Sequence, residues 1–131
     1  MRFLVIKLRG DAVFNLKFIF SPGSCGCFCL RYILKKKIVK QRYISIWKMK
    51  EVISSNGYYC SCLKLKFVTD IKGECLSLLE TKNKGMHYIV IKKITKGKIY
   101  YYDPLFLVMR KKKIEYFIEK WSGICLFYTK V

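Results

Sequence analysis

The chain has few acidic residues, one histidine and no long apolar run, and each scarcity excludes a class of protein. Only 8 of its 131 residues are Asp or Glu, against 27 Lys and Arg, which gives a formal charge of +19. The longest uncharged run, residues 18–30, is broken by Pro22 and Gly23 and is shorter than the roughly 18 apolar residues that a membrane-spanning helix needs. With His87 as the only histidine and no Cys-x-x-Cys pair, we expect neither a metal site nor another cofactor.

The seven cysteines are an odd number, so at least one thiol stays unpaired within a monomer. Cys25, Cys27 and Cys29 alternate along a predicted helix, where side chains two residues apart point in different directions. This spacing is poor for a shared zinc ion, and most of the thiols are expected to be small core hydrophobes. The pattern indicates a reducing, cytoplasmic environment.

A length of 131 residues with 53% apolar residues predicts a single folded domain, residues 1–131. The positive charge favours anionic partners, namely nucleic acid, an acidic membrane face or an acidic peptide. The lysines are spread along the chain, however, and such charge usually forms a solvated surface. No nucleic-acid-binding motif is recognisable, so we expect no specific nucleic acid, although a basic nucleic-acid-binding domain remains an alternative.

The periodicity of the apolar residues changes from helical to alternating along the chain, which predicts an α+β fold. After one or two short strands within residues 1–20, the predicted elements are helices at 25–34 and 44–54, strands at 59–67, 76–80, 88–94 and 98–102, a helix at 113–121 ended by Gly123, and a strand at 124–131.

Three residues have the side chains of a cysteine hydrolase. Cys25 follows a Ser-Pro-Gly-Ser turn and begins the first predicted helix, whose N-terminus favours a negatively charged thiolate. Gly26 beside it would allow close approach of a substrate backbone. A thiol, an imidazole base and a carboxylate that orients the imidazole form a nucleophilic set. The corresponding candidates are Cys25, His87 and Asp103.

His87 begins one arm of a predicted hairpin and Asp103 ends the other, with the turn at residues 95–97. In an antiparallel hairpin the start of one arm lies beside the end of the next. The two side chains are therefore predicted to be neighbours, although 16 positions separate them in sequence. Each residue alone has an ordinary structural explanation, and it is their predicted proximity that favours a site.

These segments resemble the peptidase C39 family over about residues 22–128. Ser24–Leu30 is similar to the family's Asp-Cys-Gly-x-Ala-Cys-Leu segment, and Met86–Ile91 to its His-Tyr/Phe-Val-Val-Ile strand. Tyr102-Asp103-Pro104 resembles the family's Asp-Pro turn, and residues 117–126 its closing Phe-x-x-x-Trp-x-Gly stretch.

The resemblance implies a papain-like cysteine peptidase with N-terminal helices packed on an antiparallel sheet. It implies Cys25 as nucleophile, His87 as general base and Asp103 as the residue that orients the base. Family members cut leader peptides of bacteriocin-like peptides after a double glycine and often belong to ABC transporters. The implied partners are a leader peptide and an ABC transporter at the cytoplasmic face of the membrane.

The sequence departs from the family pattern before the nucleophile. The family has a glutamine that stabilises the oxyanion six residues earlier, where this chain has Ile19, and an aspartate where it has Ser24. Losing one oxyanion donor typically costs about 10²–10³ in rate. A degenerate domain that binds leader peptide or transporter without efficient cleavage is therefore the alternative within the same fold.

Overall fold

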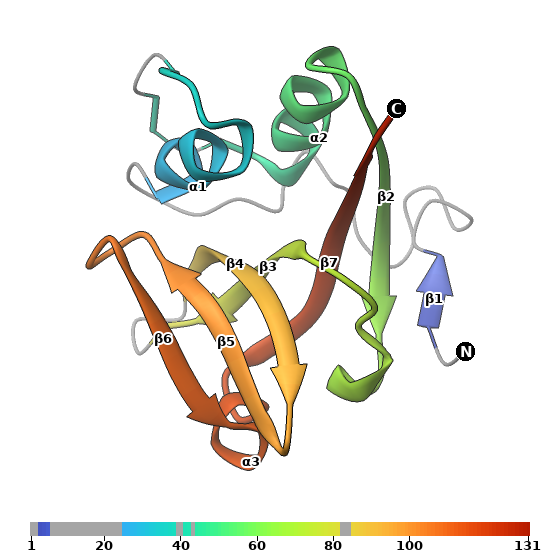
Figure 1. Cartoon of the computed structure of the whole chain (residues 1–131), viewed down its shortest axis with the longest axis vertical. Coiled ribbons are helices and arrows are strands. Elements are labelled where there is room, and N and C mark those ends of the chain that lie inside the picture. The colour runs from blue at the N-terminus through green and yellow to red at the C-terminus, as the bar shows by residue number, and fades with distance from the viewer. Residues whose placement is uncertain (1–2, 6–24, 39–40, 43, 82–84) are drawn as a thin grey trace.

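The computed structural model describes residues 3–5, 25–38, 41–42, 44–81 and 85–131, in which helices pack on a twisted antiparallel sheet (Figure 1). The elements in chain order are β1 (Phe3–Val5), α1 (Cys25–Leu34), α2 (Ile46–Ser55), β2 (Tyr58–Leu65), a 3-10 turn (Val68–Asp70), β3 (Cys75–Glu80), β4 (Met86–Thr95), β5 (Lys98–Asp103), β6 (Val108–Lys113), α3 (Ile114–Phe117) and β7 (Trp121–Lys130).

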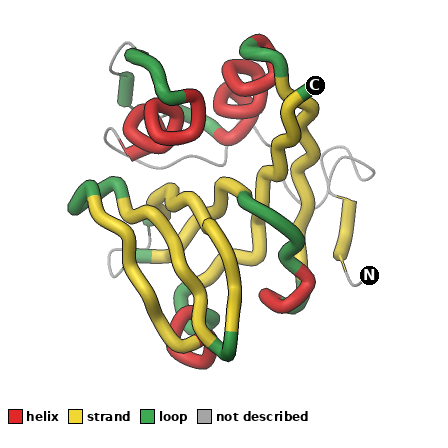
Figure 2. Tube along the Cα trace, in the orientation of Figure 1, coloured by secondary structure: helices red, strands yellow, loops and turns green. Residues whose placement is uncertain are grey.

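The seven strands form one sheet in the order β1-β2-β7-β3-β4-β5-β6, and every neighbouring pair is antiparallel. Figure 2 shows the strands in yellow, from β2 at the right of the view to β6 at the left. The predicted α+β class, with early helices on an antiparallel sheet, is confirmed. Positions 19 and 24 lie outside the described residues.

Most predicted elements are confirmed, with small shifts at their ends. The first helix begins at Cys25, and the hairpin turns at residues 95–97 as expected. The second helix begins at Ile46 because Ser45 caps it, accepting a hydrogen bond from the Lys48 N–H at 3.1 Å.

The predicted helix at 113–121 is wrong, because only Ile114–Phe117 is helical. Trp121 instead begins β7 opposite Leu79, and its indole N–H donates to the Ser77 hydroxyl of β3 at 2.9 Å. Sheet pairing thus overrides the local helical spacing. Strand β6 was not predicted at all, because its Lys-rich sequence has no apolar alternation.

Gly123 lies inside β7 rather than at a helix end, and its backbone has φ +84°. A Cβ atom there would lie 2.8 Å from the Leu65 carbonyl oxygen. Glycine is therefore required at a kink that brings β7 close to β2.

The sheet separates two apolar clusters. One packs α1 and α2 against Leu76, Leu78, Tyr88 and Val90, and the other places Phe117 of α3 near Ile89 and Tyr101. Tyr88 is fully buried, and its hydroxyl donates to the Ile44 carbonyl at 2.8 Å.

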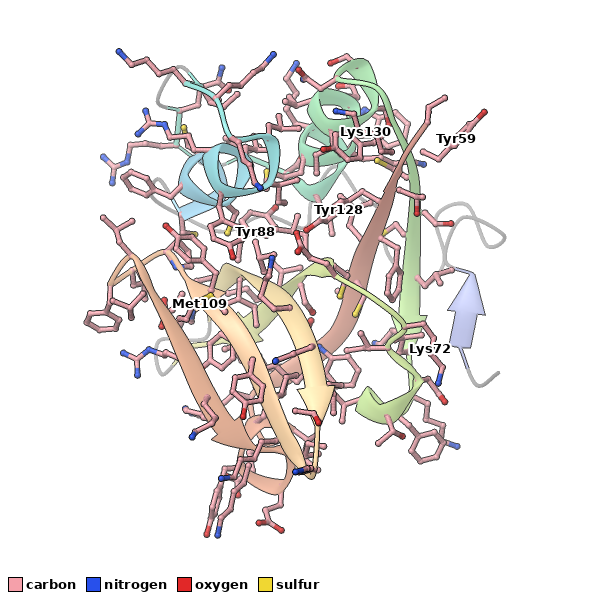
Figure 3. All side chains as sticks on the ribbon, viewed as in Figure 1. Tyr59, Lys72, Tyr88, Met109, Tyr128 and Lys130 are labelled. Atoms are coloured by element: carbon pink, nitrogen blue, oxygen red, sulfur yellow. The ribbon has the colours of Figure 1, made fainter. Side chains whose placement is uncertain are left out.

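Helix α1 lies over the end of the sheet at which β4 begins and β5 ends (Figure 1). Two contacts fix it there. The Tyr32 ring of α1 stacks on the Tyr102 ring of β5, with centroids 4.2 Å apart and planes 13° apart. A Cβ atom on Gly26 would lie 3.2 Å from the Tyr88 ring, so the first turn of α1 approaches β4 closely. Figure 3 labels Tyr88 just below α1.

Candidate active site

The hairpin brings His87 and Asp103 together, as its topology predicted. The Nε2 atom of His87 lies 4.0 Å from the Oδ1 atom of Asp103. Both side chains are largely buried, with 15% of the His87 and 7% of the Asp103 side chain exposed. The distance is too long for a hydrogen bond, but it lies within the range that an unliganded catalytic pair often shows before substrate tightens it.

Two further groups hold the Asp103 carboxylate. The Arg110 Nε atom lies 2.8 Å from Oδ2 in an ion pair, and the Leu105 N–H donates to Oδ1 at 3.0 Å. The Arg110 guanidinium also lies over the Phe106 ring, 4.5 Å from its centroid. The carboxylate is thus held from the β5–β6 loop and from β6, with Oδ1 toward the imidazole.

The surroundings of His87 favour the neutral form of its imidazole by lowering its pKa. Burial lowers the pKa of His87 because it desolvates the charged form, and the positive charges of Arg110 and Lys112 lower it further. Asp103 acts in the opposite direction but does not outweigh burial. A neutral imidazole can accept a proton, which a general base must do.

His87 and Asp103 line a groove of about 320 Å³ between the sheet and α3. We call it the His87 groove. Apolar and cationic side chains dominate its walls. The other residues that line it are Leu79, Glu80, Thr81, Tyr101, Leu105, Phe106, Arg110, Lys112, Tyr116, Phe117 and Lys120.

Cys25 is the first residue of α1 and is 5% exposed. It belongs to the apolar cluster that contains Tyr88, the residue after His87. Because successive side chains of a strand point to opposite faces, Tyr88 faces α1 while His87 faces the groove. All seven cysteines are thiols.

The structure therefore joins two of the three candidate residues, His87 and Asp103, whereas Cys25 belongs to the apolar cluster on the other face of the sheet. Neither ring nitrogen of His87 has a hydrogen-bond partner among the described residues, so Cys25 does not bond to the imidazole in this state. The thiol and the imidazole belong to elements that pack on each other, α1 and the start of β4. The catalytic roles of Cys25, His87 and Asp103 remain predictions.

Arg110 is a further residue of the site that the sequence alone does not single out. It lies in the Lys-rich segment that forms β6, where one cation cannot be told from the next. The β5–β6 pairing places it opposite Tyr101 and diagonal to Asp103. Only this register identifies the cation that reaches the carboxylate.

This arrangement defines a class. A helix that begins with cysteine and lies over the sheet end holding a His–Asp pair is the arrangement of papain-like cysteine peptidases. The peptidase C39 family model matches residues 39–131, which include His87 and Asp103 but begin after Cys25. The chain belongs to the peptidase C39 family.

Solved structures of the same fold include the peptidase domain of Streptococcus ComA, described as a bifunctional ABC transporter involved in a quorum-sensing pathway. It is 16% identical, with a TM-score of 0.63, and the match covers 87% of this chain and 99% of that domain. The Streptococcus mutans ComA peptidase domain is 18% identical, with a TM-score of 0.63 over 86% of this chain and 99% of its own length.

A complex of the Streptococcus mutans ComA peptidase domain with a small-molecule inhibitor gives 16% identity and a TM-score of 0.65, again over 86% and 99% of the two chains. At such identities the similarity concerns the fold. No curated protein matches the chain. Within the part of the chain that the structure describes, no helix combines the length and the apolarity needed to cross a bilayer.

Proposed function

We propose that this protein is a cysteine peptidase that removes leader peptides after a double glycine, with Cys25 as nucleophile, His87 as general base and Asp103 as the residue that orients His87. The observation that carries the proposal is the 4.0 Å approach of His87 Nε2 to Asp103 Oδ1, at the sheet end covered by the helix that Cys25 begins. Family membership and the ComA-like fold support it.

In the proposed reaction the Cys25 thiol gives its proton to the neutral imidazole of His87, and the thiolate attacks the carbonyl carbon of the second glycine. The imidazolium then returns the proton to the leaving amine, and the peptide bond breaks to leave a thioester on Cys25. Water, deprotonated by His87, hydrolyses the thioester and regenerates the thiol. The partial positive charge at the N-terminus of α1 stabilises the thiolate, while Asp103 stabilises the imidazolium.

The chemistry requires the thiol and the imidazole to come within hydrogen-bond reach. The residues to be brought closer lie on α1 and at the start of β4, which already pack through Gly26 and Tyr88. Because His87 faces the groove and Tyr88 faces α1, the proposal requires that substrate binding turns the imidazole out of the groove toward α1. The proposed location is the cytoplasmic face of a membrane, beside an ABC transporter that exports the product.

The experiment is cleavage of a synthetic peptide with a double-glycine leader, followed by mass spectrometry. We expect one cut after the second glycine, loss of activity in Cys25→Ala, and full activity in Cys60→Ala. Cys60 is a matched control because it is a half-buried thiol on β2. Cleavage that persists in Cys25→Ala, or that occurs elsewhere in the peptide, would refute the proposal.

A degenerate domain that binds without cutting is the second candidate, favoured by Ile19 at the position of the oxyanion glutamine. It predicts that wild type and Cys25→Ala bind the leader peptide equally and that neither cleaves it. Isothermal titration calorimetry beside the cleavage assay distinguishes the two functions. In Ile19→Gln, a gain of about 10²-fold in rate would show that an active site lacks only its oxyanion donor.

A further inference from the structure

The loop that joins β5 to β6 and the first two residues of β6 expose a run of five apolar residues. Leu105, Phe106 and Leu107 are 59%, 60% and 59% exposed, and Val108 and Met109 are 45% and 49% exposed. Burying such side chains is the main source of stability in a soluble protein, and monomers rarely expose contiguous apolar surface of this kind. We call residues 105–109 the apolar tip.

The backbone conformation of the apolar tip is also unfavourable. Leu107 has φ +54°, in the left-handed region that glycine or asparagine adopts at much lower cost than leucine. A leucine with a strained backbone and an exposed side chain does not stabilise the fold that contains it. Strain retained in a loop points to a contact made with another body.

Four consecutive cations follow the apolar tip, Arg110 and Lys111–Lys113, all in β6. Strand pleating sends Arg110 and Lys112 toward the His87 groove and Lys111 and Lys113 toward the other face. Lys113 pairs directly with Lys98 of β5, which places two like charges opposite each other. Among the described residues, Arg110 is the only one of the four in an ion pair with a carboxylate.

Strand β6 is an edge strand of the sheet, and the β5–β6 connection lies at the left edge of the described chain in the view of Figure 1. The apolar tip therefore projects, with cations behind it on both faces of the edge strand. A peptide bound in the His87 groove would contact only one face of β6. A larger surface that binds the tip together with the edge strand would contact both faces.

We propose that this corner docks on an anionic lipid bilayer. The apolar tip enters the boundary between headgroups and acyl chains, and β6 lies along the bilayer surface so that Lys111 and, at the far end of the strand, Lys113 contact the lipid phosphates. Apolar side chains combined with neighbouring cations are what interfacial binding requires, and each cation near an anionic surface strengthens binding by about fivefold. The residues substituted in the test belong neither to the Cys25, His87 and Asp103 set nor to the lining of the His87 groove; they are Leu107, Val108, Lys111 and Lys113.

The test is co-sedimentation of the full chain with vesicles of phosphatidylcholine alone or with 30% phosphatidylglycerol, a composition chosen as the probe. Two variants address the two components of the corner. Leu107→Asn with Val108→Thr removes apolar surface and relieves the left-handed strain, so the fold is retained. Lys111→Gln with Lys113→Gln removes two charges that form no ion pair among the described residues.

Matched controls remove the same chemistry elsewhere. Lys36→Gln with Lys37→Gln deletes two exposed charges after α1, and Tyr59→Ser removes an apolar side chain that is 71% exposed on β2. We expect binding to the anionic vesicles only. The lysine pair should weaken it by roughly 20-fold, the apolar pair by about tenfold or more, and the controls by less than about threefold.

The proposal is overturned if wild type ignores anionic vesicles, if the apolar variant binds them as wild type does, or if the two control variants lose as much affinity as the two test variants. It is equally overturned if the test variants keep vesicle binding and lose affinity for the leader peptide or for an oligonucleotide, since the corner would then serve that partner. Circular dichroism melting confirms that each variant is folded.

Discussion

The Nε atom of Arg110 lies 2.8 Å from the Oδ2 atom of Asp103, so the carboxylate proposed to orient His87 is itself held by a cation on the edge strand. The same cation contributes to the low pKa of His87. Arg110 therefore influences the proposed base in two ways, through the position of its partner and through charge.

Replacing Arg110 by Gln should weaken cleavage and move its acid limb to higher pH. With the nearby positive charge gone, the pKa of His87 rises, and the imidazole becomes protonated at a higher pH than in wild type. Loss of the fixed carboxylate position should reduce kcat/KM by roughly ten- to hundredfold. The measurement is the pH profile of kcat/KM between pH 5 and 8.

Two further variants separate the effect of the Arg110 charge from the effect of the Asp103 position. Arg110→Lys keeps the charge and should leave the acid limb near that of wild type. Lys111→Gln removes one charge from the neighbouring residue on the opposite face of β6, and it should change the profile little. An acid limb that moves to lower pH in Arg110→Gln would contradict this account.

The stability of the protein should fall as the pH drops below about 6.5, the value for an unperturbed histidine. In the fold the pKa of His87 is lowered, so the unfolded chain takes up a proton before the folded chain does. Unfolding is favoured by that uptake, and the effect levels off below the folded pKa. In urea-unfolding experiments, His87→Gln should reduce the slope of the free energy of unfolding against pH between pH 6.5 and 5.

Because His87 is the only histidine, whatever slope remains in the variant comes from carboxyl groups. An unchanged slope in His87→Gln would show that the imidazole is not in an environment that excludes charge.

Tyr32 and Tyr102 should contribute jointly to the attachment of α1. Their rings stack at 4.2 Å, and such pairs are worth about 0.5–1.5 kcal/mol beyond the surface that they bury. A double-mutant cycle with Tyr32→Ala and Tyr102→Ala, measured by urea unfolding, should give a coupling free energy in this range. Tyr100→Ala is the control on the same face of β5, and it should show no coupling to Tyr32→Ala.

Gly26→Ala should not raise the free energy of unfolding by the roughly 1 kcal/mol that alanine usually adds in a helix. The new methyl would lie 3.2 Å from the Tyr88 ring and 3.4 Å from the Met49 sulfur, and the Tyr88 hydroxyl is fixed on Ile44. The helix start must move away from β4, which should lower kcat/KM by about tenfold or more. An equal kcat/KM combined with higher stability would contradict the close approach of α1.

The sequence by itself determined the elements whose residues interact with near neighbours. Apolar spacing predicted α1 and α2, and alternation predicted β2 and the β4–β5 hairpin. The hairpin also determined the proximity of two of the three candidate residues, because antiparallel pairing brings position 87 next to position 103.

Only the tertiary structure decided the elements and contacts that depend on distant pairing. β6 has no apolar pattern and exists because β5 offers an unpaired edge, and Trp121 leaves a helical pattern because Ser77 of β3 accepts its N–H. The choice of Arg110 among four consecutive cations follows from strand register. The position of α1 relative to His87 likewise follows from packing around Tyr88 and Tyr102, since no local signal specifies where a helix lies on a sheet.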